Sequence, residues 1–198
     1  NTWEGIQLFS LMHEKSHRYY IPSRISLEAY MEQIHKAVYH RADIIIVAGF
    51  LFENAIHKAA KMYPNVTFVI IDGSPHNIID SQSLSTYDGH EPNFDIAPNT
   101  LSIFFQEEQA GFLAGYASFK EGFENLGFIG GMPVPAVMRY GIGFLAGIYY
   151  AAYEKERNEY AFNPDYFEYV QTFAFSEAVT LLATSFYESG EVDVIFSV

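Results

Sequence analysis

The 198-residue sequence contains no cysteine, and this absence removes several kinds of chemistry at once. Disulfides, thiolate metal sites and a cysteine nucleophile are excluded, while the redox compartment stays undetermined. Basic residues are also scarce, because 11 Lys and Arg stand against 24 Asp and Glu, a formal net charge of −13. A chain this acidic repels a phosphate backbone, so we expect no nucleic-acid partner and no general binding to anionic membranes.

Long apolar runs are missing too, since none reaches the roughly 18 residues that a membrane-spanning helix needs. The sequence opens on NTWEGIQLF, without an initiator Met, a basic segment or an apolar segment. We therefore expect that an export signal was removed or was never there. What the chain does have is apolar content: 49% hydrophobic and 17% aromatic residues predict a globular protein with a large core, either one large domain or two small ones.

A parallel βαβ unit is predicted between residues 42 and 73. The apolar run ADIIIVAGF is followed by the helical pattern LFENAIHKAAKMYPN and by a second run, VTFVIIDG. Ligands of open α/β sheets bind at the carboxyl ends of the strands, which makes Asp72 a candidate binding carboxylate. Gly49 and Phe50 follow the first strand at the same edge. An Asp at this position is alternatively a turn or helix-capping residue.

The rest of the chain also alternates between predicted helices and strands. Before the βαβ unit we expect helices over 2–15 and 26–42 with a short strand at 18–22 between them, and after it a long polar loop over 74–99. From Leu101 to the end, four apolar strand patterns alternate with three helical patterns.

This order predicts an α/β protein with parallel sheets in two lobes, residues 1–100 and 101–198. The chain begins inside a predicted helix and stops on the buried-type strand VDVIFSV. A doubly wound domain normally opens with a strand. We therefore expect the first strand of the first lobe and the last part of the second lobe to be missing.

The pentapeptide GFLAG occurs twice, at 111–115 and 143–147, and each copy places two glycines on one face of a predicted helix. A glycine inside a helix costs about 1 kcal/mol relative to Ala, so it usually marks a close backbone approach. We interpret both helices as packed tightly on a sheet. A dinucleotide-binding fingerprint fits less well, because GIGFLAG lacks the G-x-G-x-x-G spacing and follows no strand directly.

Two further patterns suggest chemistry without specifying it. His13, Glu14 and His17 spell H-E-x-x-H, the zinc-peptidase signature, at the end of a predicted helix with no obvious third ligand. We interpret the motif as solvated surface, and we expect no metal and no cofactor. Glu107 and Glu108 open a predicted helix, where acidic residues favour the positive end of the helix dipole.

Four blocks of the sequence resemble, in order and spacing, the basic membrane protein family. The blocks are GFLFENAIHKAAKMYPNVTFVIIDG, NTLSIFFQEEQAGFLAGYAS, LGFIGGMPVPAVMRYGIGFLAGI and FEYVQTF. The family consists of purine-nucleoside-binding lipoproteins, the substrate-binding components of ABC transporters. The resemblance implies a type I periplasmic-binding-protein fold with two Rossmann-like lobes that close on a purine nucleoside without catalysis. It also implies an ABC permease partner, an extracytoplasmic location, and membrane attachment only through a lipid anchor outside this sequence.

The same resemblance assigns ligand-binding roles residue by residue. Asp72 matches the Asp that hydrogen-bonds the ligand, and Phe173 matches the aromatic residue that stacks on the base. The remaining matches are Gly49, Phe50, Gly131, Met132 and Asn1. These roles are chemically reasonable, because a carboxylate accepts two hydrogen bonds from ribose hydroxyls and an aromatic ring stacks on a base.

Alternatives to these assignments stay open. Phe173 is alternatively a core residue, because the strand pattern FEYVQTF has aromatics on both faces. The family usually has an Asp near its second-lobe aromatic residue, whereas this chain has Phe175 and Ser176 there. Two other functions remain: an α/β enzyme acting on a nucleoside or sugar, with Asp72 or Glu107 as acid or base, and an intracellular ligand-sensing regulator of the same fold.

Overall fold

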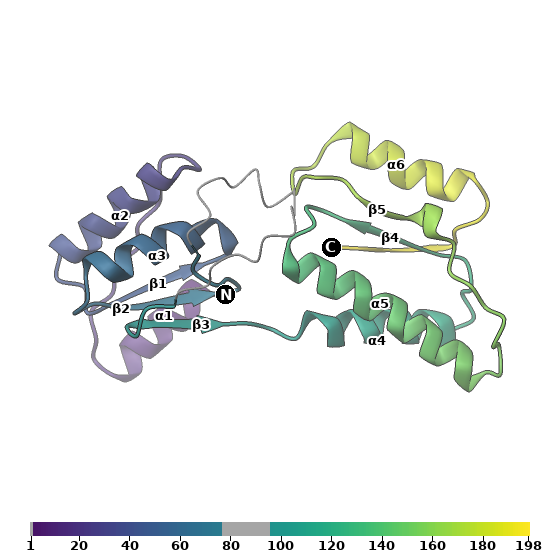
Figure 1. Ribbon diagram of the computed structural model, residues 1–198, viewed down its shortest axis with the longest axis horizontal. Helices are drawn as coiled ribbons and strands as arrows, with labels where there is room; N and C mark the ends of the chain where they lie inside the picture. Colours follow the sequence, from purple (N-terminus) through teal and green to yellow (C-terminus); the bar gives the residue numbers. More distant parts are fainter. Residues whose placement is uncertain (1, 77–95) are drawn as a thin grey trace. The chain divides into compact units, whose positions relative to one another are not determined.

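The computed structural model of the protein describes residues 2–76 and 96–198, which divide into two compact units (Figure 1). Residues 2–76 and 96–105 belong to the first unit, and residues 106–198 belong to the second. Each unit contains a three-stranded parallel sheet. The expected long loop over 74–99 lies mostly outside the described residues.

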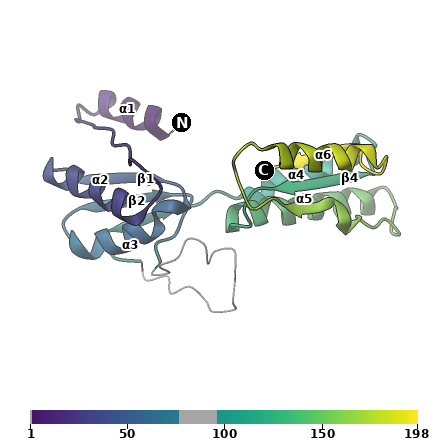
Figure 2. The same ribbon diagram turned by 90° about the horizontal axis from the view of Figure 1, so that it is seen from above.

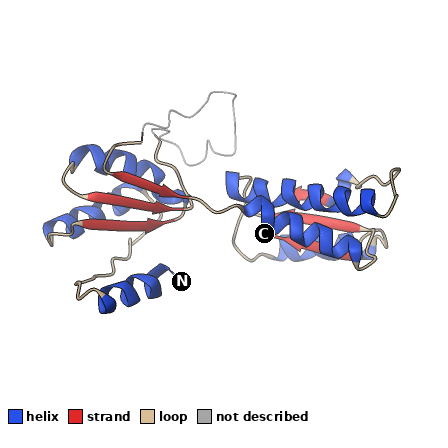
Figure 3. Cartoon of the chain, turned by 90° about the horizontal axis from the view of Figure 1, so that it is seen from below, coloured by secondary structure: helices blue, strands red, loops and turns tan. Residues whose placement is uncertain are grey.

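The sheet of the first unit is built from β1 (Ile44–Ala48), β2 (Thr67–Ile71) and β3 (Thr100–Ile103), which pair in that order. All three strands run the same way (Figure 3). The register aligns Ala48 with Ile71 and Ile71 with Ile103. The three carboxyl ends therefore lie at one edge of the sheet.

Helices α2 (Leu27–Tyr39) and α3 (Glu53–Met62) supply the core of the first unit. Ser26 caps α2, because its hydroxyl accepts a hydrogen bond from the backbone N–H of Ala29 at 3.2 Å. Helix α3 follows a short 3-10 turn, η1 (Phe50–Phe52). The buried residues of the two helices and of the sheet form one cluster that includes Tyr30, Ile34, Ala55, Ile56, Ala59, Phe68 and Ile70.

Two expectations for the amino-terminal region were wrong. Helix α1 spans Thr2–Met12 and ends before His13, so the H-E-x-x-H motif does not lie on a helix. Residues 18–22 form no strand, because their backbone pairs with neither sheet of the described chain. An apolar run supplies the composition of a strand, but only a partner that satisfies its N–H and C=O groups makes it one.

Strand β3 belongs to the first sheet, whereas we expected the apolar run from Leu101 to open the second lobe. Asn99 ties the start of this strand to the first unit. Its side-chain amide donates hydrogen bonds to the carbonyls of Ala60, Tyr63 and Val66, at 3.2, 3.1 and 2.8 Å. These carbonyls lie at and beyond the end of α3, where helix carbonyls lack intrahelical donors. One amide side chain thus joins the start of β3 to the end of α3, although Asn99 and Tyr63 are 36 residues apart in the chain.

The sheet of the second unit has β4 (Leu126–Gly130) at its centre, with β5 (Phe167–Tyr169) and β6 (Val194–Ser197) on its two sides. Helices α5 (Pro135–Glu154) and α6 (Glu177–Glu188) lie on opposite sides of β4 (Figure 2). Successive β4 residues alternate between them, because Phe128 packs with Phe144 of α5 and Ile129 packs with Phe186 of α6. A 3-10 turn, η3 (Pro164–Tyr166), precedes β5.

The repeated GFLAG segments bring two helices together backbone to backbone. Helix α4 (Glu107–Lys120) packs along α5. A Cβ added at Gly111, Gly115, Gly143 or Gly147 would lie 2.0–2.2 Å from a backbone oxygen of the other helix. The expected close approach is therefore present, but the partner of these glycines is a helix and not the sheet. Among the glycines of α4 and α5, Gly141 alone faces the sheet, where it lies against the rings of Phe128 and Phe167.

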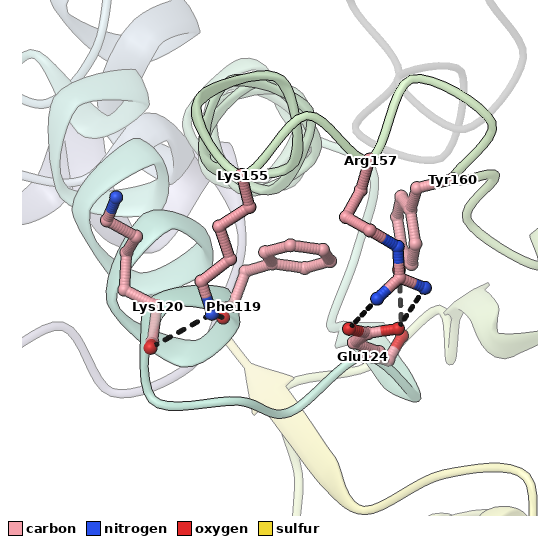
Figure 4. A network of polar contacts seen from close by, with 6 residues as sticks. All are labelled: Phe119, Lys120, Glu124, Lys155, Arg157 and Tyr160. Carbon is pink, nitrogen blue, oxygen red and sulfur yellow. Dashed lines mark hydrogen bonds and ion pairs between the residues drawn. The ribbon is translucent and has the colours of Figure 1, made fainter.

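A network of hydrogen bonds joins the residues at and just after the carboxyl-terminal ends of α4 and α5 (Figure 4). The Lys155 ammonium donates to the carbonyls of Phe119 and Lys120, at 2.9 and 3.2 Å, and so satisfies two terminal helix carbonyls. Arg157 forms a bidentate pair with Glu124, with N–O distances of 2.6 and 2.8 Å. The Tyr160 hydroxyl donates to the Glu124 carbonyl at 2.9 Å.

Tyr160 is expected to make the stability of the protein depend on alkaline pH. Burial, reinforced by the nearby Tyr149 and Glu124, raises the pKa of Tyr160 to about 12. Because this pKa lies above the unfolded value of about 10, the contribution of Tyr160 is complete below pH 10 and is lost as the pH rises toward 12. We expect Tyr160→Phe to cost about 1 kcal/mol near neutral pH, through the lost hydrogen bond.

The difference between the wild type and Tyr160→Phe should then narrow above pH 10, since only the wild type carries the titrating group. Urea unfolding of both proteins at a series of pH values measures that difference directly. A gap that stays constant up to pH 12 would contradict the expectation.

Candidate ligand-binding site

The first unit brings Gly49, Phe50 and Asp72 to the carboxyl edge of its sheet. The backbone N–H of Gly49 donates to the Ile71 carbonyl at 2.8 Å, which extends the β1–β2 pairing by one step. Gly49 has a φ of +98°, a value at which a residue with a side chain would be strained. The chain then turns directly into η1, so Phe50 lies half-buried next to the strand end.

Asp72 is held at the end of β2 in an unusual backbone conformation. Its N–H donates to the carbonyl of Ile103 at 2.7 Å, and its φ is +58°, in the left-handed region. Asp and Asn tolerate that region better than other residues with side chains. The side chain is half-buried at the strand edge. Asp72 thus follows the carboxyl end of β2, as the sequence predicts, and its role toward a ligand stays a prediction.

Three residues next to Asp72 were not found by sequence reasoning. The carboxylate of Glu53, the first residue of α3, accepts a hydrogen bond from the backbone N–H of Ser74 at 2.7 Å. Its second oxygen lies 2.9 Å from Nε2 of His76. The sequence holds no signal for this pairing, because the partners are 21 and 23 residues apart and an acidic residue in a first helical turn is common.

The second unit brings Gly131, Met132 and Phe173 together at the corresponding edge. The N–H of Gly131 donates to the Val198 carbonyl at 2.8 Å, and the N–H of Gln171 donates to the Gly131 carbonyl at 3.1 Å. A Cβ on Gly131 would lie 2.5 Å from the ring of Phe173, so the ring lies against the glycine backbone. Met132 is half-buried in the turn before α5.

Phe173 is not a core residue, since the residue is 54% exposed. Strand β5 ends at Tyr169, four residues before Phe173, which therefore lies in the following loop. Two further aromatic residues, Phe104 and Phe105, are exposed directly after β3 at the edge of the first sheet. Sequence reasoning treated them as the end of the predicted strand LSIFF, which in the structure ends at Ile103.

Glu107, the alternative acid or base, is engaged in an ion pair. Its side chain is buried, and Nε of Arg139 lies 2.7 Å from its carboxylate. The neighbouring Glu108 lies 4.0 Å from the same nitrogen. Both acidic residues begin α4, where the positive end of the helix dipole also favours them. The pair therefore has a structural role in joining α4 to α5.

The two histidines of the H-E-x-x-H motif make contacts with aromatic rings of the amino-terminal segment. His17 packs against Trp3, with ring centroids 5.2 Å apart, and His13 packs against Phe9 at 4.5 Å. Within residues 2–76 and 96–198, no three His, Asp or Glu side chains gather closely enough to hold a metal ion. Across the same residues, no helix combines the length and apolarity that crossing a membrane requires. Asn1 lies outside the described residues.

Comparisons with known proteins place the chain among binding proteins. The family model for ABC transporter substrate-binding protein PnrA-like matches residues 1–198. The CD4+ T-cell-stimulating antigen of Listeria monocytogenes is 27% identical over 203 residues, which is 99% of this chain and 48% of that protein. The ABC transporter nucleoside-binding protein BmpA of Lactococcus lactis is 27% identical over 150 residues, 74% of this chain and 37% of that protein. The chain thus spans about half the length, or less, of these relatives.

Among solved structures, an ABC transporter solute-binding protein from Aeropyrum pernix superposes with a TM-score of 0.65 at 20% identity. The match covers 98% of this chain and 48% of that structure. At this identity the likeness establishes the fold, with its parallel α/β units. The family model covers the whole chain, and we conclude that the chain belongs to the PnrA-like, or basic membrane protein, family of ABC transporter substrate-binding proteins and has the type I periplasmic-binding-protein fold.

Proposed function

We propose that the protein captures a purine nucleoside outside the cytoplasm and delivers it to an ABC permease, without chemical conversion. Membership of a substrate-binding family supports capture and delivery, and a relative named as a nucleoside-binding protein supports the ligand class. In this proposal each unit contributes the carboxyl ends of its strands to the ligand, and a lipid anchor beyond this sequence attaches the protein to the membrane.

The observation that carries the proposal is the placement of Asp72. A half-buried carboxylate at the carboxyl end of β2, with its backbone fixed by β3, is suited to accept two hydrogen bonds from vicinal ribose hydroxyls. A base needs an aromatic or apolar surface. The exposed Phe173 offers such a surface at the strand ends of the second unit, where its ring packs against the backbone of Gly131.

Calorimetric titration tests the proposal. Adenosine, guanosine, inosine, a pyrimidine nucleoside and free ribose are titrated into the protein, and the same samples are then analysed for products. We expect saturable binding of purine nucleosides, weaker binding of the pyrimidine nucleoside and of ribose, and unchanged ligand at the end. Conversion of the ligand would favour the enzyme alternative, and an absence of nucleoside binding would refute the proposed ligand class.

A further inference from the structure

The segment that follows β2 is anchored by a buried polar pair. Glu53 and His76 have side chains only 12% and 7% exposed, and Glu53 bonds to both Ser74 and His76. One carboxylate oxygen of Glu53 accepts from the Ser74 amide, and the other pairs with Nε2 of His76 at 2.9 Å. Charged groups buried to this degree are costly unless they are fully paired, and such pairs fix one local geometry when they are.

Glu53 projects from a helix turn that packs into the core of the first unit. Glu53 begins α3, and the same first turn of that helix places Ala55 and Ile56 in the core with no exposed surface. Gly73 then passes so close to Glu53 that an added Cβ would lie 3.1 Å from Oε1 and 2.9 Å from Cδ1 of Ile70. Gly73 therefore lies against the Glu53 side chain, and the next residue, Ser74, donates a hydrogen bond to it.

We propose that Glu53 is a positioning residue for Asp72, acting through the Ser74 amide and His76 to hold the segment 72–76 at the ligand edge. This inference rests on the proposed function of Asp72. The conformation of Asp72 benefits from such support, because a left-handed φ of +58° costs some free energy for any residue with a side chain, although Asp tolerates it better than most. The Ile103 carbonyl fixes Asp72 from one side, and Glu53 fixes the chain that leaves it on the other.

A loosened segment would lower ligand affinity without changing any group that touches the ligand. The apparent dissociation constant rises in inverse proportion to the fraction of molecules in the binding-competent conformation. Removing a hydrogen bond to a charged group typically shifts such an equilibrium by about tenfold or more. We therefore expect Glu53→Leu to accelerate hydrogen exchange of the Ser74 amide by about tenfold or more, and to weaken purine-nucleoside binding by the smaller factor by which the binding-competent fraction falls.

Glu53→Gln provides the conservative rescue. It keeps an acceptor oxygen for the Ser74 amide, so both exchange and affinity should return to within about threefold of the wild type, whereas a merely space-filling role would be served equally well by Leu. Glu124→Leu is the matched control. It breaks the carboxylate pair with Arg157 in the loop after α4, away from the carboxyl ends of the strands, and should lower thermal stability but leave Ser74 exchange and nucleoside affinity unchanged.

The outcomes separate this inference from the proposed function. Wild-type exchange and affinity in Glu53→Leu, or equal defects in Glu53→Leu and Glu53→Gln, would overturn the positioning role. If the wild type binds no nucleoside, the proposed function fails, and Ser74 exchange alone still decides whether Glu53 holds the segment. If Glu53→Leu does not fold, the variant His76→Leu is measured instead, because it removes the second of the two partners of Glu53. Faster exchange with weaker binding then supports the proposal, and unchanged values overturn it.

Discussion

Gly147→Ala is expected to destabilise the second unit by about 3 kcal/mol or more, an effect at the upper end of that caused by overpacking a core. A Cβ at this position would lie 2.0 Å from the carbonyl oxygen of Phe112 and 2.8 Å from the backbone nitrogen of Tyr116. Both are backbone atoms of α4, so no side chain can rotate away to make room. The two helices would have to move apart, and the contacts along their whole interface would loosen together.

This loss of stability opposes the intrinsic helix propensity, which favours Ala over Gly. In an unobstructed helix, replacing Gly with Ala gains about 1 kcal/mol. Gly5→Ala in α1 is therefore the matched control, since a Cβ there meets nothing within 4 Å and the variant should be as stable as the wild type or slightly more so. Urea unfolding of both variants measures the difference. Wild-type stability of Gly147→Ala would show that α4 and α5 do not approach at this distance.

The glycine pattern also illustrates what sequence can predict. Two glycines four residues apart indicate that one face of a helix is in close contact, because the spacing follows from helix geometry alone. The identity of the contacting element does not follow from spacing. We expected a sheet, and the partner of Gly111 and Gly147 is a second helix with the same pentapeptide. Periodicity specifies a face, whereas the neighbour of that face depends on topology.

Other features of the fold likewise divide into those set by neighbouring residues and those set by contacts between distant residues. The βαβ unit and the place of Asp72 at a strand end could be predicted, because apolar runs, a helical pattern and a turn residue lie consecutively in the sequence. The membership of β3 could not, since it depends on three hydrogen bonds from Asn99 to residues more than 30 positions away. Glu53 and His76 were missed for the same reason, as contacts between distant positions leave no local pattern.

Asp72→Asn is expected to weaken purine-nucleoside binding by about 100-fold, the largest effect that we predict on function. Two hydroxyl hydrogen bonds to an ionised carboxylate are worth more than the single good acceptor that an amide offers, and hydrogen bonds to charged groups contribute about 1.5–3 kcal/mol each. Asn is a better test than Ala, because it tolerates the φ of +58°. Ala at that φ would add a backbone cost of about 1–2 kcal/mol and so mix a folding defect with lost binding.

Asp43→Asn is the matched control for the loss of one negative charge. Asp43 is exposed immediately before β1, at the amino end of the same sheet, so its substitution should change neither affinity nor stability. Titration calorimetry gives the affinities, and urea unfolding shows whether Asp72→Asn keeps wild-type stability. Asp72→Asn with wild-type affinity would remove Asp72 from the site. A loss of affinity in Asp72→Asn alone, at unchanged stability, would locate the ribose-binding group at the end of β2, because the two variants differ only in which edge of the sheet loses its carboxylate.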